Sequence, residues 1–258
     1  MFLSVSLALA MVQAAPARTA IVSPGRWTVD YGRLSCTLAR RVGDANSPIV
    51  AFNARLGHVP GEFLIMDGGA ALAQRLNGEL HIDLGAGEPL TMRARQERRN
   101  GHPVLRLTPV PDGFLARIAG ANRLAVRSGT DEVLALPLVQ AGAAIEALSQ
   151  CNDDLLRSWG IDVRARHALS RQPIAGDFGW AAGISPATET ALVFAVDVSE
   201  RGRPLNCRVV VSSGNERMDR AFCTLVLSHA RFEPGLDAQR RAVAAQYVTV
   251  IRWLVPNY

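Results

Sequence analysis

Residues 192–211 read LVFAVDVSERGRPLNCRVVV. Apolar residues alternate with less apolar ones from Leu192 to Val198 and again from Leu205 to Val211, which is the period of a half-buried strand. Between the two runs, residues 200–204 combine Gly with Pro, the residue types that turn a chain. The stretch therefore predicts a β-hairpin.

A helix and a third strand are predicted after this hairpin. Residues 212–215, Ser-Ser-Gly-Asn, have the side chains that cap helix N-termini. The apolar residues that follow share one helical face: Met218, Ala221, Phe222, Leu225 and Val226. Residues 231–235 contain Pro and Gly and end the helix, and strand-type alternation resumes from Tyr247 to Trp253. The predicted order is strand, strand, helix, strand.

The first half of the chain consists of short β-type runs separated by Gly, Pro, Asn or Asp. The runs span residues 35–42, 48–56, 62–66, 79–84, 90–95, 104–110 and 123–126. Over residues 140–159 the apolar residues recur at helical spacing instead, and Gly160 follows as a stop. We expect an antiparallel sandwich or roll over residues 15–163, closed by a helix at 140–159.

The interval 164–188 separates the two halves. It has no sustained periodicity and contains several Gly and Pro residues, so we expect a linker or a loosely packed arm there. A second, smaller domain then covers residues 189–258. The predicted fold class is α+β, with a β-rich N-terminal domain and a ββαβ C-terminal domain.

The N-terminus has the pattern of a secretory signal peptide. An uncharged apolar stretch leads to the small-residue site Val12-Gln13-Ala14, which predicts cleavage after residue 14. An uncleaved anchor is the alternative, but the apolar run is shorter than the ~20 residues of a membrane span. Since no basic residue precedes the apolar run, a truncated start is a second alternative. The sequence predicts a periplasmic or exported protein with no stable membrane span after processing.

Four cysteines are present, and none forms a Cys-x-x-Cys pair. In an exported protein an even number favours disulfides over a metal site. Of the three possible pairings, the two-domain division selects Cys36 with Cys151 and Cys207 with Cys223. Four buried free thiols are the alternative.

The last quarter of the chain resembles the C-terminal domain of TonB. The likeness rests on the ordered combination of the hairpin with Ser212-Ser213-Gly214, Phe222-Cys223 on the helix, and Arg231-Phe232-Glu233-Pro234 after it. It is more specifically similar to a bacterial subgroup with one Cys on the second strand and one on the helix. It covers about residues 191–255.

This resemblance implies a periplasmic domain that pairs a strand edge with an extended segment of an outer-membrane receptor. The implied partner-binding residues lie on the final strand: Tyr247, Val248, Thr249, Val250, Ile251 and Arg252. The alternative is that this strand is central or covered in its sheet. Full TonB proteins also have a membrane anchor and a long Pro-rich spacer. This chain instead has a short leader and a β-rich domain, so the fold and the compartment carry over better than energy transduction.

No catalytic, cofactor or metal site is predicted. The five His residues have no partner at ligand spacing, and phosphate-binding and dinucleotide-binding motifs are absent from the sequence. Ser212 and Ser213 precede a predicted helix, where capping is a better role than nucleophilic catalysis because His229 lies at the far end. Asp67-Gly68-Gly69 is typical of a β-turn rather than of an aspartic peptidase.

Binding of nucleic acid is also not predicted. The Arg residues at 93, 95, 98 and 99 form the one local basic concentration, and Asn100-Gly101 follows them as a hairpin turn. A solvated hairpin tip therefore explains them better than a phosphate-binding patch. In the final strand, Tyr247 and Trp253 fit a core better than an exposed binding stripe.

The sequence leads to one hypothesis and one alternative. The hypothesis is a non-enzymatic periplasmic protein that binds an envelope protein through a TonB-like C-terminal domain, linked to transmembrane transport. The alternative is an exported ligand-binding or hydrolytic β-domain at residues 27–160, with the TonB-like domain as a docking adaptor.

Overall fold

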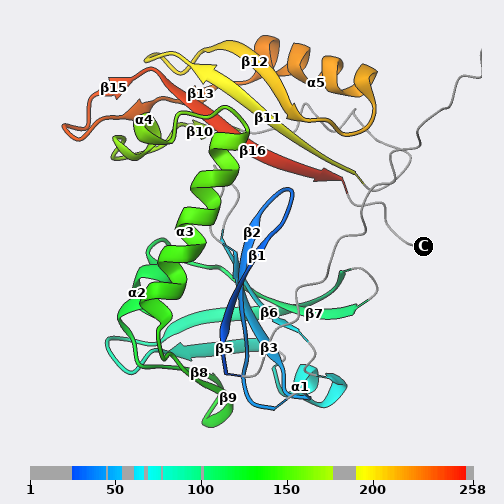
Figure 1. The fold of residues 1–258 in the computed structure, drawn as a ribbon, viewed down its shortest axis with the longest axis vertical. Coiled ribbons are helices and arrows are strands. Elements are labelled where there is room, and N and C mark those ends of the chain that lie inside the picture. Colours follow the sequence, from blue (N-terminus) through cyan, green and yellow to red (C-terminus); the bar gives the residue numbers. More distant parts are fainter. Residues whose placement is uncertain are drawn as a thin grey trace, which may run out of the picture.

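The computed structural model describes residues 25–44, 46–53, 61–66, 69–76, 78–99, 102–176 and 190–253 (Figure 1). Within these ranges the chain is a strand-rich α+β protein, as predicted. The predicted signal peptide, its cleavage site and residues 67–68 of the Asp-Gly-Gly turn lie outside the described residues.

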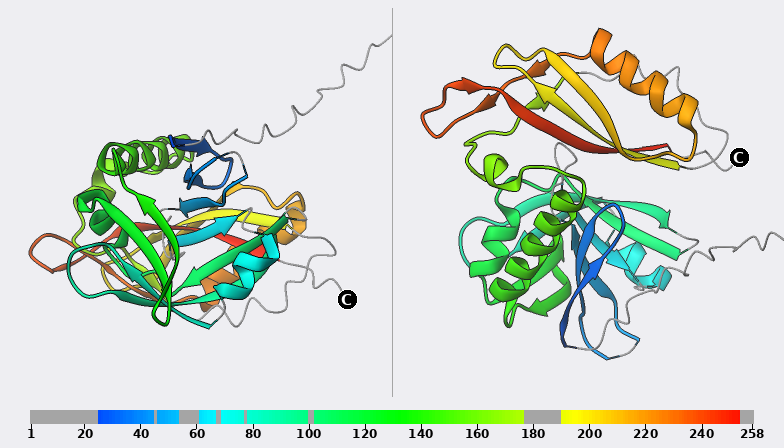
Figure 2. Two further views of the ribbon diagram at one scale, coloured as in Figure 1. Left: turned by 90° about the horizontal axis from the view of Figure 1, so that it is seen from below. Right: turned by 45° about the horizontal axis from the view of Figure 1, so that its top comes forward.

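The first half forms a curled antiparallel sheet of nine strands (Figures 1 and 2). In chain order they are β1 (Trp27–Tyr31), β2 (Cys36–Arg41), β3 (Ile49–Asn53), β4 (Glu62–Met66), β5 (Gly78–Asp83), β6 (Leu90–Arg99), β7 (His102–Thr108), β8 (Arg123–Ser128) and β9 (Asp131–Pro137). In space the order is β1-β2-β3-β4-β7-β6-β5-β8-β9. Three helices accompany it: α1 (Gly69–Arg75), α2 (Phe114–Gly120) and α3 (Ala141–Ser158).

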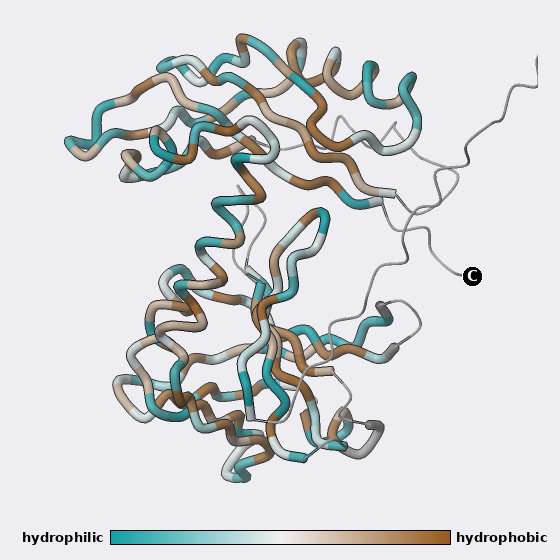
Figure 3. The backbone as a smooth tube through the Cα atoms, viewed as in Figure 1, coloured by the Kyte–Doolittle hydropathy of each residue, from teal (hydrophilic) through white to brown (hydrophobic). Residues whose placement is uncertain are grey.

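The curl brings the two ends of this sheet together. Trp27 at the start of β1 donates its Nε1–H to the Val139 carbonyl oxygen just after β9, at 2.8 Å. Arg40 of β2 is buried, lies over the Trp27 ring and donates to the Pro137 carbonyl oxygen at 2.8 Å. Inside the curl, Phe52, Phe63 and Phe114 form an aromatic core. Figure 3 shows hydrophobic stretches along the strands of this sheet. The predicted roll is therefore closed by side chains at its edges.

Helix α3 covers the inside of the curl and matches the predicted helix within one residue at each end. It packs against α2, β1 and β2. The Cys36–Cys151 disulfide joins it to β2, with 6.1 Å between the Cα atoms. Gly160 follows with φ +69°, the left-handed conformation that commonly ends a helix.

The second half has a three-stranded sheet in the order β12-β11-β16, with helix α5 on one face. Its elements are β11 (Thr190–Val198), β12 (Pro204–Val211), α5 (Glu216–His229) and β16 (Ala245–Trp253). The Cys207–Cys223 disulfide joins β12 to α5, with a Cα–Cα distance of 5.5 Å. Both predicted disulfides are thus present, as is typical of proteins that fold in an oxidising compartment.

Part of the predicted linker has regular secondary structure. Residues 164–176 include most of helix α4 (Val163–His167) and strand β10 (Ile174–Ala175), which pairs with β13 (Phe232–Glu233). Residue Arg171 also bridges Leu236 in β14 (Gly235–Leu236), which pairs with β15 (Ala242–Val243). Sequence periodicity does not reveal these pairings, because a strand of two residues is too short to show a period. The rest of the interval, 177–189, lies outside the described residues.

Candidate functional site at the junction of the two sheets

Strand β16 is an edge strand of its sheet. It pairs with β11 along its whole length, from Thr190 opposite Trp253 to Val198 opposite Ala245. Among the described residues no strand pairs with its other edge. Within the described residues the strand is therefore at the edge of its sheet and not central in it.

The side chains of β16 are nevertheless largely covered. Tyr247, Val248 and Thr249 are only 2%, 1% and 5% exposed, whereas Arg252 is exposed. Tyr247 packs against the rings of Phe194 and Phe232, so its predicted core role is confirmed. The middle of this strand therefore presents few side chains to solvent.

The opposite face of the sheet from α5 rests on the end of α3. Val193, Ala195 and Val248 pack against Trp159, Ile161 and their neighbours. Arg208 of β12 donates from Nη1 to the Trp159 carbonyl oxygen at 2.8 Å and from Nη2 to the Gly160 carbonyl oxygen at 2.9 Å. These carbonyls end α3 and carry the negative end of its dipole, so the guanidinium fixes the sheet to the helix.

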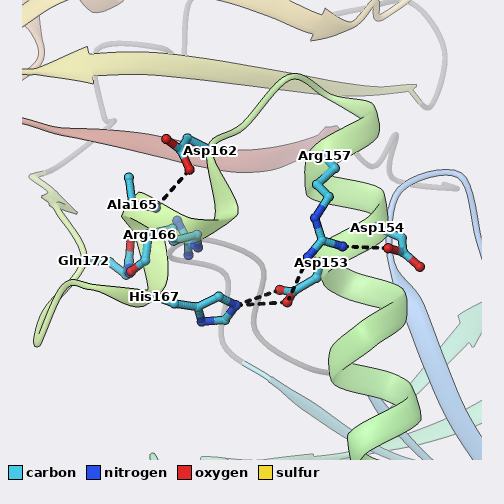
Figure 4. Close-up of polar contacts among 8 residues, drawn as sticks. All are labelled: Asp153, Asp154, Arg157, Asp162, Ala165, Arg166, His167 and Gln172. Carbon is cyan, nitrogen blue, oxygen red and sulfur yellow. Dashed lines mark hydrogen bonds and ion pairs between the residues drawn. The ribbon is translucent and has the colours of Figure 1, made fainter.

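A polar cluster lies where α3 passes into α4 (Figure 4). His167 Nε2 lies 3.0 Å from both carboxylate oxygens of Asp153, which also attracts Arg157 at 3.8 Å. Asp162 caps α4 by accepting from the Ala165 N–H at 2.9 Å. The Asp153–His167 pair therefore links α4 to α3 at the surface of the protein.

A cavity of about 450 Å³, the junction pocket, lies between α4 and the end of the three-stranded sheet. Its lining residues are Gly160, Ile161, Asp162, Ala165, Arg166, Leu169, Asp197, Val198, Leu205, Ala244, Ala245 and Gln246. Burial lowers the pKa of the Arg166 guanidinium, and the Asp153 carboxylate opposes this shift. Arginine nevertheless stays protonated in proteins, so the pocket holds a partly desolvated cation.

Ser212 and Ser213, which the sequence suggests as capping residues, have a structural role. Ser212 Oγ and Ser213 Oγ each donate at 2.6 Å to the buried Asp219 carboxylate of α5. Asn215, not a serine, is the capping residue, since its Oδ1 accepts from the Met218 N–H at 3.1 Å. His229 ends α5, far along the helix from the serines.

Strand geometry distributes the basic residues of β6 over both faces of the sheet. In strands, neighbouring side chains point to opposite faces, so Arg93 and Arg95 share a face that Arg98 does not. Glu79 lies opposite Arg93, and Arg106 opposite Arg95 pairs with Glu62 at 3.1 Å. The pattern is that of a solvated strand, as expected.

The described residues also bear on metal binding and on membrane insertion. No group of three or more His, Cys, Asp or Glu side chains that could hold a metal ion is found there. No described helix has both the length and the apolar character needed to cross a membrane.

A smaller cavity of about 130 Å³ in the first sheet is lined in part by Asn53, Glu62 and Asp112.

Comparisons with known proteins give no identity. No family model, curated protein or solved structure matches this chain. The resemblance to the TonB C-terminal domain thus depends on the sequence motifs alone.

Sequence reasoning missed Arg166, Arg208 and the Asp153–His167 pair. A local signal did exist, because Gly160 and then Asp162 are typical of one helix that ends and another that begins. The pocket itself has no local signal, since its walls are far apart in sequence.

Proposed function

We propose that this chain is a non-enzymatic periplasmic protein that binds another protein of the bacterial envelope through a TonB-like C-terminal domain. An extended segment of the partner, of the outer-membrane-receptor class, pairs its backbone with the outer edge of β16. Linkage to transport across the outer membrane follows from that partner class.

The observation that carries the proposal is the unpaired edge of β16 in the described sheet. Unpaired strand edges are templates for strand addition, in which main-chain hydrogen bonds supply affinity. Two further features support it: the motif order around Ser212-Ser213-Gly214, and two disulfides of the kind formed in exported proteins.

Site-directed photo-crosslinking in living cells tests the proposal. The probe is placed singly at Val250 and Arg252, which are half-buried and exposed, because Val248 and Thr249 are too deeply buried to carry it. We expect capture of one outer-membrane receptor from β16. A matched probe at Leu227, which is 43% exposed on α5, should not capture it.

Equal capture from Leu227 and β16, or capture of only the protein's own first sheet, would contradict the proposal. The captured receptor should also be linked through an extended segment, which peptide mass mapping of the adduct identifies. A crosslink to a folded receptor surface would argue against strand addition.

Ligand binding by the first sheet is the second candidate. It is favoured by the smaller cavity, where the Oδ1 of Asn53 is buried and makes no hydrogen bond within the described chain. The neighbouring Glu62 already accepts from Asn53 at 2.7 Å and pairs with Arg106. Asn53→Leu should then abolish binding in a small-molecule thermal-shift screen, and absence of any hit would remove this candidate.

A further inference from the structure

The junction pocket is a composite of the two halves of the chain. Residues 160–169 supply one wall, and the ends of β11, β12 and β16 supply the other. Ligand sites occur preferentially at such boundaries. Anything bound there contacts α4, which lies outside the three-stranded sheet.

Arg166 is the one basic residue among those that line the pocket. In the described part of the chain, no carboxylate lies within ion-pair distance of its guanidinium. Asp153, whose charge acts on it, is occupied by His167 and Arg157. A partly desolvated guanidinium without an acceptor gains from any carboxylate that reaches it.

The two acidic residues in the lining are already engaged. Asp162 accepts from the Ala165 N–H, and Asp197 accepts from Gln246 Nε2 at 3.0 Å and Asn206 Nδ2 at 3.3 Å. The remaining surface is mostly apolar, with Ile161, Leu169 and Val198 among its members. Within the described residues the lining thus combines one guanidinium that has no ion-pair partner, two hydrogen-bonded carboxylates and an apolar wall.

The pocket reaches the start of β16, because Ala244, Ala245 and Gln246 belong to its lining. A segment that pairs with the outer edge of β16 has one end at this position. We propose that the partner segment places an acidic side chain, flanked by an aliphatic one, in the junction pocket, where Arg166 binds the carboxylate. This inference rests on the proposed function and makes α4 the source of partner specificity.

The test uses the full oxidised chain and a display library of random linear peptides as the probe. We expect enriched peptides to contain Asp or Glu next to Val, Leu or Ile. Arg166→Gln should weaken their binding about tenfold or more, because a charge-assisted hydrogen bond is lost. Ala165→Trp, which fills the pocket from α4, should weaken it similarly.

Arg164→Gln is the matched control. Arg164 lies on the same helix, is exposed and is not part of the pocket lining, so binding should change less than about twofold. Circular dichroism and thermal unfolding of each variant verify that α4 and the sheet are retained. Arg166→Lys should bind more tightly than Arg166→Gln but less tightly than the natural chain. Lysine keeps the positive charge but lacks the paired N–H donors of the guanidinium.

A photo-probe at Arg252 separates this inference from the proposed function. Peptides that crosslink at 252 but bind Arg166→Gln as tightly as the natural chain overturn the pocket assignment and leave strand addition intact. Peptides that depend on Arg166 without crosslinking at 252 overturn strand addition, and with it the assigned occupant. A library that yields no enriched peptide counts against both.

Discussion

The two larger sheets of the described structure differ in what their edge strands contact. The nine-stranded sheet curls until Trp27 and Arg40 reach the carbonyls of residues 137–139, so that its first and last strands are tied together. The three-stranded sheet is covered on both faces but leaves the outer edge of β16 unpaired in the described structure. Proteins usually protect exposed edges, so the unpaired edge of β16 agrees with the proposed strand addition, although β12 is also an edge strand of the described sheet.

The largest expected difference between the halves concerns their disulfides. Cys36–Cys151 closes a separation of 115 residues and Cys207–Cys223 one of 16. In the chain-entropy model, replacing both cysteines by Ser should lower the free energy of unfolding by about 5 kcal/mol for the first pair and about 3 kcal/mol for the second. Urea unfolding followed by tryptophan fluorescence measures both, and the reverse order would show that strain or residual structure dominates.

The packed face of β16 predicts an alkaline transition. Burial raises the pKa of the Tyr247 phenol to about 12 from 10.0. Between these values the folded state binds more protons than the unfolded state, so stability present below pH 10 is lost as the pH rises towards 12. The loss should be about 2–3 kcal/mol at the upper end.

Tyr247→Phe is the control for this transition, because it removes the titrating group and keeps the ring. The free energy of unfolding of this variant should not change between these two pH values, except through other titrating groups that the natural chain also has. Ultraviolet titration of the Tyr31→Phe, Tyr258→Phe double variant, in which Tyr247 is the remaining tyrosine, gives the pKa directly. A phenol that ionises near its ordinary value would contradict the packing of β16.

The attachment between the two halves depends on Arg208. Arg208→Ala leaves the Trp159 and Gly160 carbonyls without their donor and should cost about 1–3 kcal/mol. Arg203→Ala, at an exposed position in the turn before β12, should cost much less. Hydrogen exchange should accelerate at residues 159–161 in the first variant only, and uniform acceleration would indicate general destabilisation.

The smallest expected effect is at the polar cluster. His167→Ala removes the contact with Asp153, but the His167 side chain is exposed, so the loss should be less than about 1 kcal/mol. Differential scanning calorimetry compares it with His81→Ala in the first sheet. A loss of several kcal/mol would mean that α4 is held mainly through this pair.

Much of the local structure follows from the sequence. The alternation around residues 200–204 predicts β11 and β12, and the runs of the first half match β2 to β8 within a few residues. Strand β9 and helix α2 were missed as separate elements; α2 has only about two helical turns, which is too short to show a helical period. Local residue patterns also cannot give the order β4-β7-β6-β5-β8, which depends on contacts between distant segments.

The candidate site was predictable only in part. The final strand was identified from its alternation and from the TonB resemblance, but its open edge depends on the order of strands in the sheet. The junction pocket brings together Arg166, Asp197 and Gln246, which no local pattern connects. Its chemistry comes from the way α4 folds back onto the sheet.

Hydrogen exchange of individual backbone amides along β16, measured by NMR on the protein alone, tests the central claim most directly. In an edge strand, every second amide pairs with β11 while the others face outward. We therefore predict alternating slow and fast exchange over residues 246–252. Uniform protection along the strand would mean that its outer edge is already occupied, and would contradict the account.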